Sequence, residues 1–453
     1  MSATGEIAEF IVRTPADSIP PSVLHEGKRC FINYMAVALY ASRDPSLGIL
    51  LDVFREEGGK PRASVLGTGV RTTLQNAALA NGYLGHLEDY DDTHFPTVIH
   101  PSSPTIPAAL AVAEQRGAGG RDVLAAATLG MEVCCRIGLA IHPAHYDAGW
   151  HITGTCGVFG AAGAAGRLLG LDTPRLVHAL GIAGTQASGV REVFGSMTKP
   201  FHAGRAAQSG VLGALLAERG FTSTTAILEG RRGFAAVLSS SYDLAKATDG
   251  LGQRWELRMN GLKPYACGVV NHPLIDAMIA LRSRAGVSPE AVDSVAARVH
   301  PLVLELVDRR QPRVGLEGKF SFQHSMAVGL VDGAAFPAQY TDAKVADPMI
   351  TALRERITAT ADPSLGQDAA VVTLRLKDGR SYTEAVSHAT GAPQNPMSDA
   401  QLEAKFRALV SEVLPKRRME KLLGLLWDME KVSDVRELVT LVRISRRLAR
   451  PNS

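Results

Sequence analysis

The chain has 453 residues, of which 46 % are hydrophobic, 21 % charged and 6 % aromatic, and its formal net charge is +3. This length exceeds the ~100–200 residues of one domain, so it predicts two domains with sizeable buried cores. Acids and bases are interspersed, which excludes the long basic runs of proteins that bind nucleic acid or membrane surfaces.

The N-terminal segment carries Glu6 and Glu9 and has no apolar core behind a basic start, so we expect no secretory signal. No uninterrupted apolar stretch reaches the ~20 residues of a membrane span. The five cysteines show no CxxC spacing, which argues against a disulfide framework and a structural zinc site. These features predict a cytoplasmic protein without nucleic-acid or membrane partners.

From the start to about residue 262, apolar residues recur at helical spacing, which predicts an all-helical region. The apolar residues from Leu74 to Leu87 fall on one side of a helix that leads into the acidic stretch 88–92. Glycine recurs at every third position from Gly154 to Gly166, and such a stripe predicts a helix edge for tight packing. No P-loop or dinucleotide-binding motif occurs, so nothing favours a nucleotide fold.

The pattern changes after Lys263. Residues 291–307 contain a β-rich stretch, and residues 369–391 read as two strands joined through Asp378 and Gly379. Helical periodicity then returns, with Ser398 and Gln401 in capping-box spacing. The predicted fold class is therefore mainly α, with a large discontinuous helical domain over residues 1–262 and 396–453 and a smaller α+β domain over residues 263–395.

Four segments concentrate polar residues in apolar surroundings. The first, residues 86–103, supplies Asp89, Thr93 and His100 together with further acids. Carboxylates this close shift each other's pKa, and an imidazole beside them exchanges protons near neutral pH. Metal binding is a rival interpretation, although no HExxH or comparable ligand spacing favours it. A capped helix end with solvated acids is the other alternative.

The second segment, residues 145–157, places His151 before the glycine-rich helix, where a lone histidine is more often structural than catalytic. The third, residues 190–210, spaces Lys199, His202 and Arg205 three positions apart. If a helix begins near His202, its exposed amides and these cations form an anion site suited to carboxylates. A solvated basic face is the alternative, and the apolar neighbours disfavour it.

The fourth segment, residues 260–277, lies at the predicted domain junction, where ligand sites are frequent. It offers Lys263, Tyr265 and Cys267. The thiol is either a nucleophile or a buried structural group, and the second interpretation is favoured because no base is evident beside it. Later in the chain, Lys319 precedes a predicted helix, and we expect it to have a packing role.

These segments, in this order, resemble the MmgE/PrpD family, which contains 2-methylcitrate dehydratases, cis-aconitate decarboxylases and iminodisuccinate epimerases. The resemblance extends from about residue 5 to 440, and its specific parts are HLEDYDDTH with HPSS, MTKPFHAGRAA, ILEGRRGF, KPYACGVVNHPLIDA and KFSFQHSMAVGLVDG. It implies a large helical domain, a smaller α+β lid, a site in the cleft between them, and a homodimer without metal or other cofactor.

By position, the resemblance implies catalytic roles for Asp89, His100, His151, Lys199 and Lys263, and a substrate contact for Thr93. We add His202, Arg205 and Tyr265 as candidate substrate-binding residues. One departure concerns the decarboxylases of the animal type, which carry another histidine just after the second lysine. Cys267 and Gly268 stand there in this sequence, which disfavours decarboxylation. The stretch from Asp89 to His100 is also one residue longer.

The leading hypothesis from the sequence is a metal-independent hydro-lyase acting on a small, 2-methylcitrate-like polycarboxylate. Lysine and arginine side chains would hold the carboxylates and stabilise an enediolate. His151 or His100 would then take the α-proton, with Asp89 setting a tautomer or serving as the acid. The alternatives are an epimerase of an iminodisuccinate-like diacid, a cis-aconitate-type decarboxylase, a non-catalytic carboxylate-binding protein and a structural dimeric scaffold.

Overall fold

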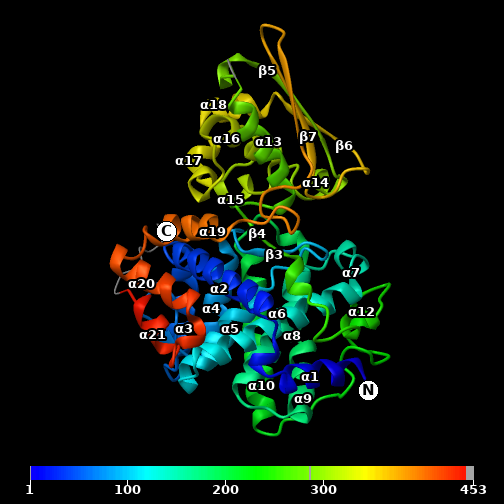
Figure 1. Ribbon diagram of the computed structural model, residues 1–453, viewed down its shortest axis with the longest axis vertical. Coiled ribbons are helices and arrows are strands. Elements are labelled where there is room, and N and C mark those ends of the chain that lie inside the picture. The colour runs from blue at the N-terminus through cyan, green and yellow to red at the C-terminus, as the bar shows by residue number, and fades with distance from the viewer. Residues whose placement is uncertain (1, 285–286, 445–453) are drawn as a thin grey trace. The chain divides into compact units, whose positions relative to one another are not determined.

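A computed structural model describes residues 2–284 and 287–444, and the chain divides into two compact units (Figure 1). The first comprises Met1–Leu87, Asp91–Asn260 and Ser398–Ser453, and the second comprises Glu88–Tyr90 and Gly261–Met397. The prediction of a mainly helical protein with a smaller α+β part is confirmed. That three residues, Glu88–Tyr90, group with the second unit was not anticipated from the sequence.

Helices make up most of the first unit. Its N-terminal elements are α1 (Ala3–Arg13), α2 (Pro21–Ala41), α3 (Ser46–Glu57), β1 (Ala63–Ser64) and β2 (Arg71–Thr72). The central elements are α4 (Leu74–Leu87), β3 (Asp92–His94), α5 (Ser102–Arg116), α6 (Gly120–Ile141), α7 (Ala144–Asp147), α8 (Ile152–Leu168), α9 (Thr173–Gly184), α10 (Thr198–Glu218), α11 (Phe234–Leu238) and α12 (Ala245–Thr248). The prediction that this region is all helical is wrong in one respect, because it also contains the short strands β1, β2 and β3. These strands are too short to show the alternation of polar and apolar residues that predicts a strand.

The C-terminal helices α19 (Asp399–Val410), α20 (Lys416–Trp427) and α21 (Arg436–Leu441) return to the first unit. Figure 1 shows α19, in orange, beside the blue α2, against which it packs. Its predicted capping box is present, because Ser398 accepts from the Gln401 amide and the Gln401 side chain accepts from the Ser398 amide. The discontinuous helical domain predicted from the returning periodicity is therefore observed.

Glycines allow the central helices to approach one another at backbone distance. A Cβ atom at Gly157 would lie 2.7 Å from Pro104 of α5, and one at Gly160 would lie 2.7 Å from the carbonyl oxygen of Gly130 in α6. A Cβ atom at Gly204 of α10 would overlap the carbonyl oxygen of Leu79 in α4. The glycine stripe of α8 is thus a packing edge, as its spacing predicts.

Among the described helices, α6 alone is long and apolar enough to cross a membrane by length and composition. However, 94 % of its apolar window is buried inside the protein. Such burial is typical of the core helix of a globular protein, since a helix that is apolar on all sides must be covered on all sides.

The second unit is built on a four-stranded sheet in the order β6-β5-β7-β8. Its elements are β4 (Asn260–Leu262), α13 (His272–Arg282), β5 (Val292–Val299), α14 (Pro301–Leu306), α15 (Gly315–Gly318), α16 (Phe322–Asp332), α17 (Asp342–Val345), α18 (Pro348–Arg354), β6 (Ile357–Ala361), β7 (Ala370–Leu376) and β8 (Ser381–Val386). β5 pairs in parallel with β6 and antiparallel with β7. α13 packs on β7 and β8 and against α16.

The predicted hairpin at Asp378 and Gly379 is confirmed. β7 and β8 pair antiparallel, with Arg375 opposite Ser381, and Gly379 adopts φ 88° in the turn between them. This left-handed conformation strains any residue with a Cβ atom, so glycine is required there.

We predict that Gly204→Ala destabilises the protein by about 1–3 kcal/mol, because the added methyl group overpacks the contact between α10 and α4. Gly424→Ala in α20 is the matched control, since its Cβ atom would meet nothing within 4 Å. Alanine should stabilise that exposed helix position by up to about 1 kcal/mol. Urea denaturation of both variants measures the difference, and equal effects would contradict the packing argument.

Candidate active site

A cluster of polar side chains in the first unit surrounds the C-terminal end of α4. His86 places its Nδ1 2.8 Å from Oδ2 of Asp91, and both side chains are fully buried. The Ser103 hydroxyl donates to the same carboxylate oxygen at 2.5 Å. Because a carboxylate only accepts, His86 carries a hydrogen on Nδ1.

Asp92 lies beside this pair at the N-terminus of α5. Its carboxylate accepts hydrogen bonds from the Ser102 hydroxyl and from Nδ2 of Asn260, the second at 2.7 Å. Burial, followed by repulsion from Asp91, raises the pKa of Asp92 to about 6. The site therefore holds one acid that titrates near neutral pH.

His100 faces the backbone of the same loop. Its Nδ1 lies 2.7 Å from the Asp92 carbonyl oxygen and 3.2 Å from the Thr93 hydroxyl. A carbonyl oxygen cannot donate, so His100 also carries a hydrogen on Nδ1. The rings of His86 and His100 have centroids 4.7 Å apart, which brings Thr93 and His100 together with the His86–Asp91 pair.

His151 stands at the N-cap position of α8, where the helix backbone fixes it. Its ring centroid lies 5.5 Å from that of His86, and its Nδ1 lies 3.0 Å from Nδ1 of His202. One hydrogen lies between these two nitrogens, so one ring donates and the other accepts. Sequence reasoning did not single out His86, although it stands at the start of the HLEDYDDTH segment.

Burial lowers the pKa of His151 well below its ordinary value, and the neighbouring His86 and Lys199 lower it further. The same causes lower the pKa of His202 to about 4. Both rings are therefore neutral at pH 7. A polyanion placed beside them would raise both pKa values, because it favours the protonated form.

Lys199 lies in the first turn of α10 and is buried. Its Nζ lies 5.3 Å from the centre of the Phe194 ring, whose edge packs against His151. The prediction that the helix begins near His202 is wrong, since α10 begins at Thr198. Arg205 consequently falls on an exposed face, where its guanidinium donates to Gln208 at 2.5 Å.

The second unit holds the other predicted catalytic pair. Lys263 donates from Nζ to the Asp89 carboxylate at 2.8 Å and to the Asp89 carbonyl at 3.0 Å, and both side chains are buried. Asp89 adopts φ 51°, a conformation uncommon for residues other than glycine. The lysine thus holds both the charge and the backbone of Asp89 in place.

Lys319 binds Glu88, the residue before Asp89, in the same way. Its Nζ lies 2.6 Å from both the carbonyl oxygen and the carboxylate of Glu88. The Tyr90 hydroxyl donates to the Pro264 carbonyl at 2.7 Å. The expected packing role of Lys319 describes only part of its contacts, because its ammonium group also forms an ion pair with Glu88. Three consecutive residues, Glu88–Tyr90, are each held by a polar group of the second unit.

The remaining candidates have structural partners. The Tyr265 hydroxyl donates to Asp276 at 2.5 Å. Burial raises the pKa of the Cys267 thiol to about 11, so it is protonated at neutral pH and poorly suited to be a nucleophile. Both ring nitrogens of His145 are engaged, by the Leu238 carbonyl and the Thr155 hydroxyl, so this side chain has a structural role.

The structure thus gathers Thr93, His100, His151, Lys199 and His202 around the His86–Asp91 pair in the first unit, and joins Asp89 to Lys263 in the second. Arg205 and Tyr265 contact other groups. Within the first unit, His86 and His100 are the side chains of this cluster that could hold a metal ion. Chemically, the cluster offers oriented imidazoles, of which His151 and His202 are neutral at pH 7, beside a buried ammonium group. This arrangement is suited to proton transfer next to a carboxylate.

Comparisons with known proteins cover nearly the whole chain. Residues 5–247 match the family model described as the MmgE/PrpD N-terminal domain, and residues 265–429 match that of the MmgE/PrpD C-terminal domain. A cis-aconitate decarboxylase of Aspergillus terreus is 27 % identical over 97 % of this chain and 95 % of its own length. The human cis-aconitate decarboxylase is 28 % identical over 83 % of this chain and 80 % of its own.

A 2-methylcitrate dehydratase of Cupriavidus necator is 28 % identical, but over 33 % of each chain. These relatives are lyases by name, which supports an enzyme of that class. The relatives aligned over most of the chain are decarboxylases, so the comparisons favour decarboxylation over the hydro-lyase reaction that leads among the sequence hypotheses. The homodimer, the cytoplasmic location and the independence of metal stay predictions.

We predict that the protein loses stability as the pH falls from about 6.5 towards 4. Burial lowers the pKa of His145 to about 4 and that of His94 to about 3, whereas the pKa of an unfolded histidine is about 6.5. Each unit of difference between these pKa values corresponds to about 1.4 kcal/mol of unfolding free energy. In this window the unfolded chain binds more protons, so acid favours unfolding. His151 and His202 act in the same direction.

Asp92 opposes this trend with one proton, because its raised pKa makes the folded protein bind a proton that the unfolded chain releases between about pH 4 and 6. Burial also raises the pKa of Glu26, Glu132 and Asp276. The histidines with lowered pKa values, which include His142 and His324, outnumber these carboxylates, so the net effect remains a loss of stability in acid. Urea denaturation at pH 4.5, 5.5, 6.5 and 7.5 measures the trend, and an unfolding midpoint that rises on acidification would refute it.

We also predict that Asp91→Asn releases the tautomer of His86. In the native protein the hydrogen lies on Nδ1, whereas the neutral asparagine can present either an acceptor or a donor to that nitrogen. Long-range ¹⁵N–¹H NMR of histidine-labelled protein distinguishes the two tautomers, and His86→Gln assigns the signal. Asp122→Asn, at an exposed position in α6, should change nothing, and a native spectrum with hydrogen on Nε2 would disprove the assignment.

Proposed function

Because the chain belongs to the MmgE/PrpD family, we propose that it is a lyase that decarboxylates a small, cis-aconitate-like polycarboxylate. One observation carries the proposal: neutral, oriented histidines are clustered with the buried ammonium group of Lys199. The names and coverage of the decarboxylases support the reaction type, since those relatives align with 83 % to 97 % of this chain.

Decarboxylation of a β,γ-unsaturated acid needs few chemical groups. The bond to one carboxyl carbon breaks and its electron pair forms a new double bond, while the former π pair takes a proton at the far carbon. Carbon dioxide leaves, and one proton is consumed. The enzyme must therefore supply a proton donor, and it must neutralise the carboxylates that remain.

We assign the proton transfer to His151, with His202 as its hydrogen-bonded neighbour. The two rings share one hydrogen at 3.0 Å and are neutral before substrate binds. Arrival of a polyanionic substrate raises their pKa, so that one ring takes up a proton from solvent. A ring whose intrinsic pKa is low then gives up this proton readily to the substrate carbon.

Lys199 is the proposed carboxylate ligand in the first unit, because its ammonium group is buried among apolar and neutral rings. His100, whose Nδ1 is bound to the Asp92 carbonyl, and Thr93 complete the polar lining. Asp89 and Lys263, which form a buried ion pair in the second unit, keep the catalytic role that the family resemblance implies.

Dehydration of a hydroxy polycarboxylate is the second candidate. A neutral histidine is also a base that can take an α-proton, and Cys267 and Gly268 stand where decarboxylases of the animal type carry a histidine. In that reaction the α-proton goes to the imidazole, and hydroxide leaves as water with a proton from an acid. Asp92, whose pKa is raised to about 6, is the candidate acid of the cluster, and its protonated fraction grows as the pH falls below 7.

We predict that the protein converts cis-aconitate to a dicarboxylate with release of one carbon dioxide, in the presence of a metal chelator. Proton NMR in deuterium oxide follows the product, which should carry one deuterium at the protonated carbon. Release of water from 2-methylcitrate or citrate, without release of carbon dioxide, would show that the reaction is dehydration and not decarboxylation. Turnover of none of these acids would remove the assignment of the histidine cluster as a lyase site.

His151→Gln should lower kcat by at least about 100-fold, which is the scale of a lost general acid or base. His25→Gln is the matched control, because His25 pairs with Asp399 at a partly exposed position. Lys199→Met should raise KM through the loss of a carboxylate ligand. Full activity in His151→Gln would contradict its proposed role.

A further inference from the structure

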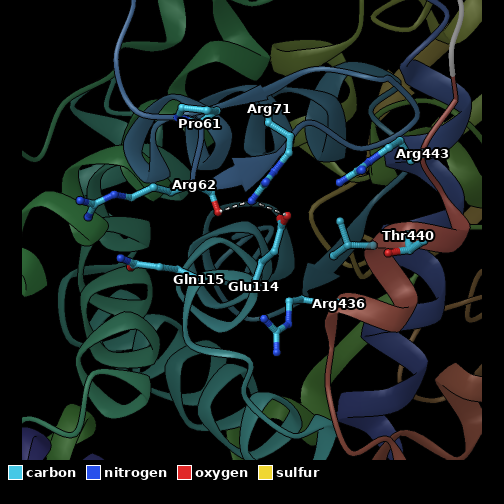
Figure 2. A pocket seen from close by; sticks show the side chains of 9 residues that line it. Pro61, Arg62, Arg71, Glu114, Gln115, Arg436, Thr440 and Arg443 are labelled. Carbon is cyan, nitrogen blue, oxygen red and sulfur yellow. Dashed lines mark hydrogen bonds and ion pairs between the residues drawn. The ribbon is translucent and has the colours of Figure 1, made fainter.

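A cavity of about 590 Å³ lies in the first unit at the C-terminal end of α5 (Figure 2). Three separate parts of the chain contribute to it: the β1–β2 hairpin, the end of α5 and the segment around α21. Its charged and amide side chains are Arg62, Arg71, Glu114, Gln115, Arg436 and Arg443. Four arginine residues thus line one cavity with a single carboxylate, and Figure 2 shows the Arg62 side chain directed away from Glu114.

The carboxylate does not neutralise the cavity. Glu114 is buried and accepts from the Ser64 amide at 2.7 Å and from the Ser64 hydroxyl at 2.8 Å. Arg71 lies 3.6 Å from it, and the other contact of this guanidinium is the Arg62 carbonyl at 3.1 Å. Arg436 pairs with Asp434 outside the lining. Positive charge therefore remains in excess.

The arrangement differs from a solvated basic surface in two respects. Arg71 and Arg443 come from opposite ends of the sequence, yet Figure 2 shows both reaching towards Glu114 from two sides. Arg443 is directed there by a 3.4 Å contact with the Ser64 hydroxyl. In addition, a concave wall focuses the field of like charges, which raises the local concentration of anions.

We propose that this cavity binds a small polyanion bearing phosphate or several carboxylates, at a site separate from the histidine cluster. Guanidinium groups bind such oxygens through paired hydrogen bonds, and the volume falls within the range of small-molecule sites. The two sites lie at opposite ends of α5, whose 15 residues span about 20 Å. The inference does not depend on the lyase reaction.

Calorimetric titration with inorganic pyrophosphate in about 50 mM salt tests the site. The native protein should show saturable binding that weakens at 200 mM salt, since the attraction is ionic. Arg71→Gln and Arg443→Gln should each weaken the affinity at least tenfold. Arg219→Gln, an exposed arginine of the first unit with contacts only to its own neighbourhood, should leave it unchanged.

Glu114→Gln guards against a result caused by misfolding. It removes the only carboxylate of the lining while keeping an oxygen that can accept from Ser64, so pyrophosphate should bind several-fold more tightly. A tighter complex cannot arise from loss of structure. Absence of saturable binding, or binding that ignores both Arg443→Gln and Glu114→Gln, would overturn the proposal.

A parallel titration with citrate identifies the chemistry of the ligand. Competition between citrate and pyrophosphate, with equal loss in Arg443→Gln, assigns polycarboxylates as well as phosphates to the cavity. Citrate binding that persists in Arg443→Gln but disappears in Lys199→Met belongs to the histidine cluster, and the cavity is then a phosphate site. Because lyase turnover is a separate readout, failure here leaves the proposed reaction standing.

Discussion

The arrangement of the first unit depends on contacts between helix backbones that only glycine permits. Gly82 and Gly204 face each other between α4 and α10, where a Cβ atom at Gly82 would lie 2.7 Å from the Gly204 Cα atom. Gly154 similarly brings α8 against the Ser188 carbonyl and His202. His86 lies in the last turn of α4, His151 at the N-cap of α8 and Lys199 in the first turn of α10. The close approach of these three helices therefore assembles the cluster.

Such close packing has an electrostatic consequence, because it excludes water from the polar groups at the helix ends. Because burial disfavours the charged form, the pKa values of His151 and His202 are lowered, and each ring of the cluster needs a hydrogen-bonding partner of its own. Asp91 serves His86, the Asp92 carbonyl serves His100, and His202 serves His151. The resulting set of fixed tautomers suits proton transfer because no ring has to reorient.

The parts of the fold that local patterns encode could be predicted from the sequence. The end of α4 at Leu87, the hairpin at Gly379 and the capping box at Ser398 each follow from a few neighbouring residues. The exposed position of the Arg205 side chain could not be predicted, because moving a helix start by four residues changes the environment of its side chains. The partners Asp89 and Lys263 stand 174 positions apart, and no local pattern shows that their charges meet. His86 was passed over because its pairing with Asp91 depends on the turn at Asp89.

Helix α5 is engaged at both ends, since Ser102 and Ser103 hold Asp92 and Asp91 at its start and Glu114 binds Ser64 near its finish. Each residue of an α-helix turns the chain by about 100°. Deleting or inserting one residue between Ser103 and Glu114 would swing one set of groups away from its partners. The length of this helix is therefore fixed to the residue, and natural variation in chain length should fall in the loops on either side of it.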